Sequence, residues 1–153
     1  MTKDHYPLDG VTVLDFGQVY HGPYCGFLLA MAGANVIKIE PKTGEHLRNR
    51  GTGDIITLPF AMLNSNKKCV TLNIKSERGK EILKKMAKKA DVLMENFAPT
   101  VMDRLEVGYE TMKAVNPKLV YASGSGFGRT GPHRDKLAMD LTVQAVSGVM
   151  SVT

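Results

Sequence analysis

The sequence predicts an α/β fold built on a parallel sheet flanked by helices. Short segments rich in β-branched residues alternate along the chain with segments whose apolar residues recur at helical spacing, a pattern typical of parallel sheets. The expected strands cover residues 11–16, 35–40, 69–74, 91–97 and 119–123. The expected helices cover residues 24–32, 76–89, 102–105 and 109–115, and residues 140–150 again have helical spacing.

Residues 11–40 are predicted to form a compact βαβ unit. A turn-like Leu8-Asp9-Gly10 precedes the first strand, and Gly22-Pro23 opens the apolar segment that suits a helix. Gly33 stands where a helix C-cap is expected, and Pro41 ends the second strand. The short connections are those that such units have.

Residues 41–60 interrupt this alternation. Gly44, Gly51, Gly53 and Pro59 occur here among charged residues, which predicts a long loop. Loops of this length inside compact domains are usually functional or mobile. Regular structure resumes with the third strand, after which Ser76 is a suitable N-cap for the next helix.

Composition limits the class of protein. The chain has 153 residues, 43% of them hydrophobic and 23% charged, which suits one domain with a substantial core. No apolar run approaches the about 18 residues that a membrane span needs, and the first residues lack the pattern of a secretory signal, so we expect a cytoplasmic protein without a membrane partner. Cys25 and Cys69 lack metal-site spacing, so no metal is expected, and Cys25 reads as a small buried thiol.

The formal net charge of +5 suits a polyanionic partner, either nucleic acid or a phosphorylated cofactor. Because the cations are dispersed and few aromatics lie between them, nucleic acid is the weaker alternative. The lysines between residues 80 and 89 are expected to form a solvated helix face rather than a docking patch.

Ligand sites in open α/β sheets lie at the carboxyl ends of the strands. After the first strand, residues 17–23 place two glycines and polar groups before a helix N-terminus, where free N–H groups bind anions. His21 is as consistent with a structural role as with ligand contact. Residues 124–132 hold four glycines with Arg129, which favours a ligand-binding loop, whereas residues 64–68 on their own favour a polar turn. From these patterns we predict an anion- or nucleotide-binding α/β domain.

Several of these segments together resemble the class III CoA-transferases, the family that includes formyl-CoA transferase and carnitine CoA-transferase. The resemblance spans nearly the whole chain and rests on residues 7–16, 22–25, 33–41, 64–68, 72–75, 90–97, 121–128 and 139–148, which occur in the family's order. It implies a Rossmann-like large domain that binds coenzyme A or acyl-CoA as substrate, a carboxylate as second substrate, no nucleic acid, and a homodimer or other self-association.

By position, the resemblance also implies which residues contact CoA. They are Val19, Tyr20, His21, Leu72, Asn73, Ile74, Lys75, Asn96, Phe97, Ala98, Arg104, Lys136, Leu137, Ala138 and Met139. Arg104 is expected near the phosphates, whose negative charge Arg and Lys hold well. Some relatives have an arginine near the adenine where this chain has Pro41, so Lys42 or Arg48 would replace it.

The family's reaction uses a nucleophilic aspartate that is expected beyond Thr153, so no catalytic residue is assigned within the chain. Asp140 belongs to the family motif and is distinct from that nucleophile. Met139 stands where racemase relatives have a histidine, and methionine cannot act as a base, which favours a transferase. We therefore expect residues 1–153 to form one truncated CoA-binding domain, without the second domain and the C-terminal return segment, and inactive alone. The alternative is a stand-alone CoA- or nucleotide-binding module.

Overall fold

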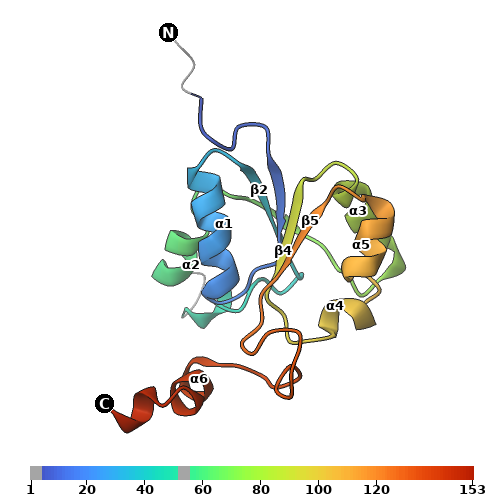
Figure 1. The fold of residues 1–153 in the computed structure, drawn as a ribbon. Coiled ribbons are helices and arrows are strands. Elements are labelled where there is room, and N and C mark those ends of the chain that lie inside the picture. The colour runs from blue at the N-terminus through green and yellow to red at the C-terminus, as the bar shows by residue number, and fades with distance from the viewer. Residues whose placement is uncertain (1–4, 52–55) are drawn as a thin grey trace.

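The computed structural model describes residues 5–51 and 56–153. Its centre is a five-stranded sheet in the order β3-β2-β1-β4-β5, and every neighbouring pair is parallel (Figure 1). The strands are β1 (Thr12–Asp15), β2 (Asn35–Glu40), β3 (Lys68–Thr71), β4 (Val92–Glu95) and β5 (Val120–Ser123). The predicted parallel α/β fold is confirmed, and each expected strand is present, mostly a residue or more shorter at its ends.

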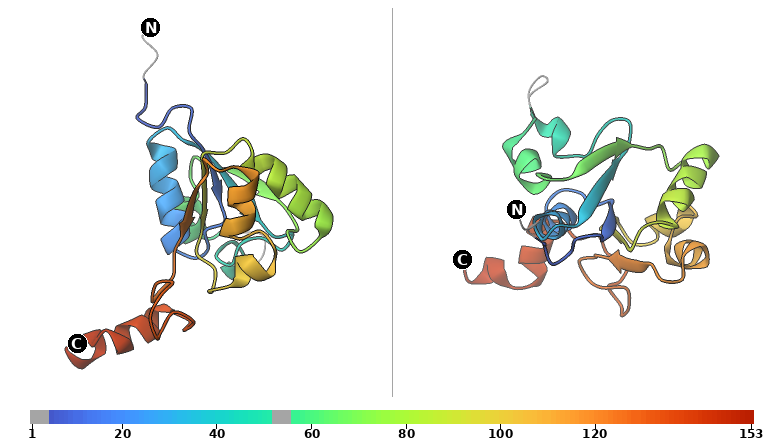
Figure 2. Two further views of the ribbon diagram at one scale, coloured as in Figure 1. Left: turned by 45° about the vertical axis from the view of Figure 1, so that its right-hand side comes forward. Right: turned by 90° about the horizontal axis from the view of Figure 1, so that it is seen from above.

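Helices cover both faces of this sheet, as the two further views in Figure 2 show. Helices α1 (His21–Met31) and α2 (Leu58–Leu63) lie on one face, and α3 (Glu77–Ala87) and α5 (Tyr109–Val115) lie on the other, with the short α4 (Val101–Arg104) beside α5. Within the residues that the structure describes, no helix is both long and apolar enough to cross a membrane.

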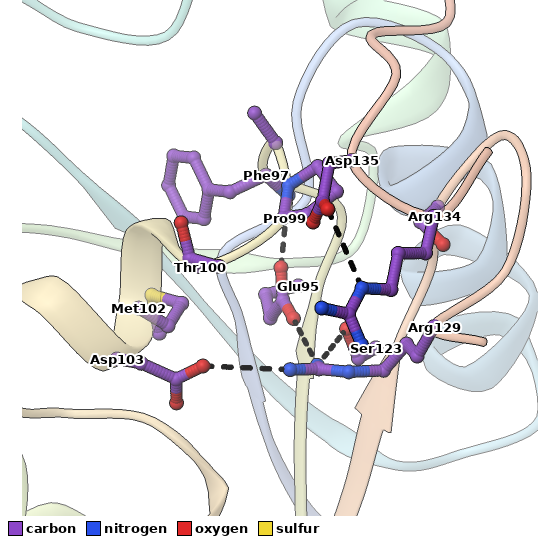
Figure 3. Close-up of a pocket in the computed structure, with 12 residues that line it drawn as sticks. Glu95, Phe97, Pro99, Thr100, Met102, Asp103, Ser123, Arg129, Arg134 and Asp135 are labelled. Carbon is purple, nitrogen blue, oxygen red and sulfur yellow. Dashed lines mark hydrogen bonds and ion pairs between the residues drawn. The ribbon is translucent and has the colours of Figure 1, made fainter. Parts of the chain in front are cut away.

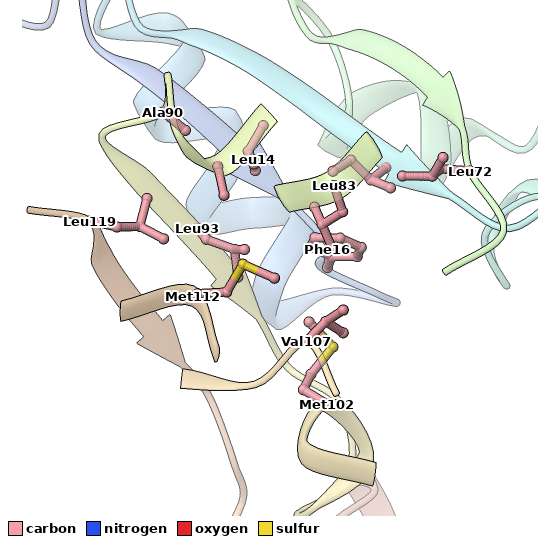
Figure 4. Packing of buried hydrophobic residues seen from close by; sticks show 12 residues of the cluster. Leu14, Phe16, Leu72, Leu83, Ala90, Leu93, Met102, Val107, Met112 and Leu119 are labelled. Carbon is pink, nitrogen blue, oxygen red and sulfur yellow. The ribbon is translucent and has the colours of Figure 1, made fainter. Parts of the chain in front are cut away.

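The strand side chains alternate between two hydrophobic clusters. Leu14 and Leu93 point into the cluster beneath α3 and α5, where Leu83 and Met112 meet them (Figure 4). Their neighbours in sequence point to the opposite face and form a second cluster, with Val13, Val36 and Met94 packed against Ala30 of α1. This alternation is the two-residue period of a strand, and it fixes the register of the sheet.

The strand order reverses between β1 and β4. From β1 the chain proceeds to β2 and β3 on one side of the sheet, and later to β4 and β5 on the other. The connections after β1 and β4 consequently diverge to opposite faces. This point at the carboxyl edge, which we call the crevice, is the usual ligand position in open α/β sheets.

Helix α1 differs from the sequence prediction in its start and in one side chain. It begins at His21 rather than at residue 24, because Pro23 occupies its first turn, where a missing N–H costs nothing. Cys25 was expected to be buried, and this is wrong: Cys25 is exposed. Gly22, Pro23, Gly26 and Ala30 form the buried face of the helix, and Cys25 lies off that face.

Residues 41–60 were expected to form one long loop, and the structure contradicts part of this. The 3-10 helix η1 (Arg48–Arg50) and the start of α2 lie within the segment, while Gly53 falls outside the described residues. Thr57 caps α2 by accepting a hydrogen bond from the Phe60 N–H (3.4 Å), and Pro59 lies in the first turn. Proline at that place favours a helix start rather than a loop.

The segment after β5 extends away from the sheet. It carries α6 (Asp140–Val146) and the 3-10 helix η2 (Val149–Ser151), which Figure 1 shows apart from the other helices. The expected helix 140–150 is interrupted because Gly148 adopts a left-handed conformation (φ 82°), which is common where helices end. Apolar side chains of this segment, such as Leu141 and Val146, are exposed.

Candidate functional site

The loops after β1 (residues 16–20) and after β4 (residues 96–100) are joined at the crevice. The Gln18 N–H donates to Asn96 Oδ1 (2.7 Å), and Asn96 Nδ2 donates to the Gln18 carbonyl (3.0 Å). A single side chain thus satisfies both backbone groups of Gln18. The loop after β1 is thereby held across the point where the strand order reverses.

Buried charges hold the rest of the loop after β1. The Gly17 N–H donates to Asp15 Oδ1 (2.6 Å), and Lys38 Nζ donates to the Gly17 carbonyl (2.7 Å). Val19 has a left-handed backbone (φ 62°), and its N–H donates to Glu45 Oε1 (2.7 Å). Three consecutive residues therefore have their backbone groups fixed by side chains from elsewhere in the chain.

Close backbone packing explains the two glycines around this loop. A Cβ on Gly17 would lie 2.5 Å from the Gly22 carbonyl carbon, and one on Gly22 would lie 2.5 Å from the Gly17 Cα. Any larger residue at either position would push the loop off the start of α1. Glycine is required here because the two backbone segments approach each other closely.

Lys67 and Asp15 form a buried ion pair beneath α1. Lys67 Nζ donates to Asp15 Oδ2 (2.7 Å), to the Pro23 carbonyl (2.8 Å) and to Asn64 Oδ1 (3.0 Å), and both charged side chains are fully buried. Burial lowers the pKa of Lys67, and Asp15 opposes that shift. The expectation of a simple polar turn at residues 64–68 is therefore incomplete, because Lys67 turns inward and ties the turn to β1.

A second charged pair lies at the end of β2. Arg48 donates through Nε and Nη2 to both oxygens of Glu40 (2.8 and 2.6 Å), and its guanidinium stacks on Phe60. Burial by itself would raise the pKa of Glu40, but the hydrogen bonds and charge of Arg48 hold it below its ordinary value. Both hydrogen bonds of the Arg48 guanidinium to Glu40 occupy it within the fold. Lys42, the other cation that was expected to replace an arginine at Pro41, is exposed.

A pocket of about 180 Å³ lies beside the crevice, between the ends of β4 and β5 and helix α4 (Figure 3). Phe97, Ala98, Pro99 and Met102 supply apolar wall. Polar and charged groups complete the lining: Glu95, Thr100, Asp103, Ser123, Ser125, Arg129, Arg134 and Asp135. The pocket therefore combines an apolar wall with hydroxyl and charged groups.

Arg129 connects the glycine-rich loop to the floor of this pocket. It donates to Ser123 Oγ (2.8 Å) and lies 3.5 Å from Asp103 and 3.9 Å from the buried Glu95 (Figure 3). The Phe97 N–H donates to the other oxygen of Glu95 (2.8 Å), which fixes the start of the loop after β4. Residues 124–132, which were predicted to form a ligand-binding loop, contribute Ser125 and Arg129 to the lining of this pocket. The guanidinium of Arg129 is itself paired with Ser123, Asp103 and Glu95.

The structure brings two of the predicted contact groups together. Val19, Tyr20 and His21 lie at the end of β1, next to Asn96, Phe97 and Ala98 at the end of β4. His21 is exposed and its ring lies against Gly124, where an added Cβ would come within 2.5 Å of Cε1.

The other predicted residues lie along the same edge but are spread over it. Leu72, Asn73, Ile74 and Lys75 follow β3, an edge strand, and Leu72 is packed in the core, so only its backbone can face a ligand. Arg104 is exposed at the end of α4. Lys136, Leu137, Ala138 and Met139 precede α6, and Ala138 packs on Gly126.

Sequence patterns missed the charged residues that shape this edge. Asp15, Lys38, Glu40 and Glu45 are all buried. Three of them lie in segments that read simply as strand, and Glu45 lay in the expected loop. The one available signal was the presence of ionisable residues in otherwise apolar strands, since such groups are buried only when they are paired. In the described ranges, no cluster of three His, Cys, Asp or Glu side chains could hold a metal ion.

Comparison with known proteins identifies the family. The model of CoA-transferase family III matches residues 8–153. The formyl-CoA:oxalate CoA-transferase of Streptomyces avermitilis is 45% identical over 100% of this chain and 37% of that protein. The acetyl-CoA:oxalate CoA-transferase of Acetobacter aceti is 46% identical over 99% of this chain and 39% of that protein. The chain therefore spans well under half the length of the curated relatives it matches.

Solved structures agree with this assignment. A CAIB/BAIF family protein from Brucella suis superposes with a TM-score of 0.91 at 33% identity, over 98% of this chain and 41% of that one. A hypothetical protein from Mycobacterium tuberculosis also gives 0.91, at 36% identity, over 99% and 42% of the two chains. Since the likeness in sequence and in fold extends along the chain, this protein belongs to CoA-transferase family III.

Proposed function

We propose that residues 1–153 form the CoA-binding, N-terminal part of an acyl-CoA:carboxylate CoA-transferase. One observation carries the proposal: in a chain of this family, the loop after β1 is held against the loop after β4 at the reversal of strand order. Parallel α/β sheets bind nucleotide-like ligands at that position. CoA would lie along the carboxyl edge of the sheet.

The charges along this edge support an anionic ligand. Lys75, Arg104 and Lys136 are exposed on segments that follow β3, β4 and β5, respectively. CoA carries several phosphate charges, and guanidinium and ammonium groups bind phosphate through charge-assisted hydrogen bonds. In the proposal Arg104 contacts a phosphate, and Lys75 and Lys136 add to the attraction.

The pocket beside the crevice supports placement of the uncharged part of the ligand. Its wall combines Phe97, Pro99 and Met102 with the hydroxyls of Ser123 and Ser125, and its charged lining residues pair with one another. The pantetheine arm of CoA alternates amides with short alkyl groups and matches such a lining. The arm would pass Asn96, Phe97 and Ala98 with its thiol directed beyond the end of β4.

The substrates are proposed from the relatives' names. Both curated relatives described above transfer CoA from a short acyl group to oxalate, as their names state. We propose a short-chain acyl-CoA as donor and oxalate or a similarly small carboxylate as acceptor.

The proposed reaction uses an aspartate outside residues 1–153. Its carboxylate attacks the thioester carbonyl, which gives a mixed anhydride and releases the CoA thiolate. The thiolate then attacks the aspartyl carbonyl, which frees the donor carboxylate and leaves an aspartyl-CoA thioester. The acceptor carboxylate next attacks the aspartyl-CoA thioester, which gives a second mixed anhydride and releases the CoA thiolate again. The thiolate attacks the acceptor's carbonyl in that anhydride, which forms the new acyl-CoA and regenerates the aspartate, so that one difficult transfer is divided into easier steps.

This mechanism predicts that the 153-residue chain alone does not transfer CoA. Formyl-CoA and oxalate would be incubated with it, and oxalyl-CoA would be measured by chromatography. We expect no product above the rate without protein, because the nucleophile lies elsewhere. Turnover by the chain alone would show that one of its own residues attacks the thioester, and would contradict the proposed mechanism.

A further inference from the structure

We infer that Glu45 is a positioning residue, whose buried carboxylate holds the loop after β1 in its ligand-binding conformation. The inference rests on the proposed function, since it assigns a purpose to that loop. Glu45 is not among the predicted CoA contacts, and it lies in a segment that the sequence predicted only as a loop. It affects ligand binding through Val19 and does not contact the ligand itself.

Val19 needs an external restraint. Its φ of 62° is left-handed, a region that β-branched residues rarely adopt. Such residues persist only where their surroundings over-determine the conformation, and they concentrate at functional sites. Val19 directly precedes Tyr20, the N-cap of α1, so its conformation sets the direction in which Tyr20 and His21 leave the loop.

The side chain of Glu45 supplies that restraint. Glu45 is 2% exposed, and its Oε1 accepts the Val19 N–H at 2.7 Å. Its Oε2 is buried and has no hydrogen-bond partner among the described residues. A carboxylate with one unpaired oxygen is a poor way to stabilise a fold, because burial without a partner costs free energy. If Glu45 Oε1 serves to hold the Val19 N–H in place, this conformational role accounts for a buried glutamate at this position.

Glu45 is itself held in place from β2. Its N–H donates to Glu40 Oε2 (2.9 Å), and Glu40 is gripped by Arg48 through two hydrogen bonds. Through Glu45, the backbone of Val19 is therefore connected to Glu40 at the end of β2. On the other side of the loop, Asn96, which directly follows β4, fixes Gln18, the residue next to Val19.

Two variants of Glu45 separate positioning from general stability. Glu45→Gln keeps a side-chain carbonyl that can accept the Val19 N–H, whereas Glu45→Ala removes the acceptor. Glu110→Ala on α5, an exposed carboxylate outside the loops after β1 and β4, is the matched control for loss of charge. Amide hydrogen exchange would be followed by NMR at Val19 and at the core residues Leu14 and Leu93, and CoA affinity by calorimetry.

In Glu45→Ala we expect Val19 exchange to accelerate by at least about tenfold while Leu14 and Leu93 keep their protection, because only the loop opens. The dissociation constant for CoA should rise about tenfold, since the binding-competent loop becomes a minor state. Glu45→Gln should restore both quantities to within about twofold of the unmodified chain, as expected when a neutral acceptor suffices. Glu110→Ala should change neither.

Three results would overturn the inference. They are unchanged Val19 exchange in Glu45→Ala, equal acceleration at Val19 and in the core, and faster Val19 exchange with unchanged CoA affinity. If the unmodified chain does not bind CoA, the proposed function fails and the ligand-binding half of the inference fails with it. The exchange data still decide whether Glu45 holds the loop, so the two failures are distinguishable.

Discussion

Replacing Lys67 with methionine is expected to lower the free energy of unfolding by about 3–5 kcal/mol, the usual cost of removing one partner of a buried ion pair. Both side chains of the Lys67–Asp15 pair are fully buried, and all three ammonium donors have acceptors. Methionine retains the length of the side chain but leaves the Asp15 carboxylate desolvated without its counter-charge. Urea denaturation followed by circular dichroism would measure the loss.

Two further variants make this result specific. Lys67→Met combined with Asp15→Asn should lose less than the sum of the single losses, because the uncompensated charge disappears with its partner. Arg78→Met breaks an exposed pair with Glu81 on α3 and should cost no more than about 1 kcal/mol. A loss below about 1 kcal/mol for Lys67→Met, equal to that of the surface pair, would refute the structural role of the buried pair.

Replacing Arg104 with alanine is expected to weaken CoA binding by about 1.5–3 kcal/mol, the contribution of a hydrogen bond to a charged group. Arg104 is exposed at the end of α4, which follows the loop after β4 directly. Because the side chain is on the surface, its removal should leave the thermal unfolding temperature nearly unchanged. Calorimetric titration of CoA into both proteins would measure the difference in affinity.

The matched control is Lys118→Ala, which removes an exposed cation just before β5, at the opposite edge of the sheet from the proposed ligand. Its CoA affinity should equal that of the unmodified chain, since this charge lies at the amino edge of the strands. A higher salt concentration should reduce the difference in CoA affinity between Arg104→Ala and the unmodified chain, because screening weakens contacts with phosphate. Equal affinity of Arg104→Ala and the unmodified chain would place the CoA phosphates elsewhere.

Short sequence patterns predicted the fold well, because strands and helix caps depend mainly on residues that are close together in the sequence. The β-branched runs gave all five strands, and Ser76 caps α3 as expected by accepting the Gly79 N–H. The predictions were wrong where one residue type occurs in two kinds of structural environment. Pro59 suggested a loop but lies in the first turn of α2, and Cys25 suggested a buried thiol but lies off the buried face of α1.

The geometry of the candidate site could be predicted only in part, because its contacts join distant residues. The loop after β1 was identified as a ligand-binding candidate from its glycines. The groups that shape it were not: Asn96 is 78 residues from Gln18, and Lys67 is 52 residues from Asp15. No helical or strand period extends that far, so the sequence pattern could mark Asp15 as an ionisable residue in an apolar strand but could not identify Lys67 as its partner or Asn96 as the partner of Gln18.

Calorimetric titration of CoA into the 153-residue chain tests the central claim most directly. We expect saturable binding at a single site, which weakens as salt is raised because phosphate contacts contribute to affinity. Addition of CoA should also perturb the amide signals of Val19 and Asn96, the two sides of the crevice. Absence of saturable binding at millimolar CoA would contradict the proposal that this part of the protein binds the cofactor.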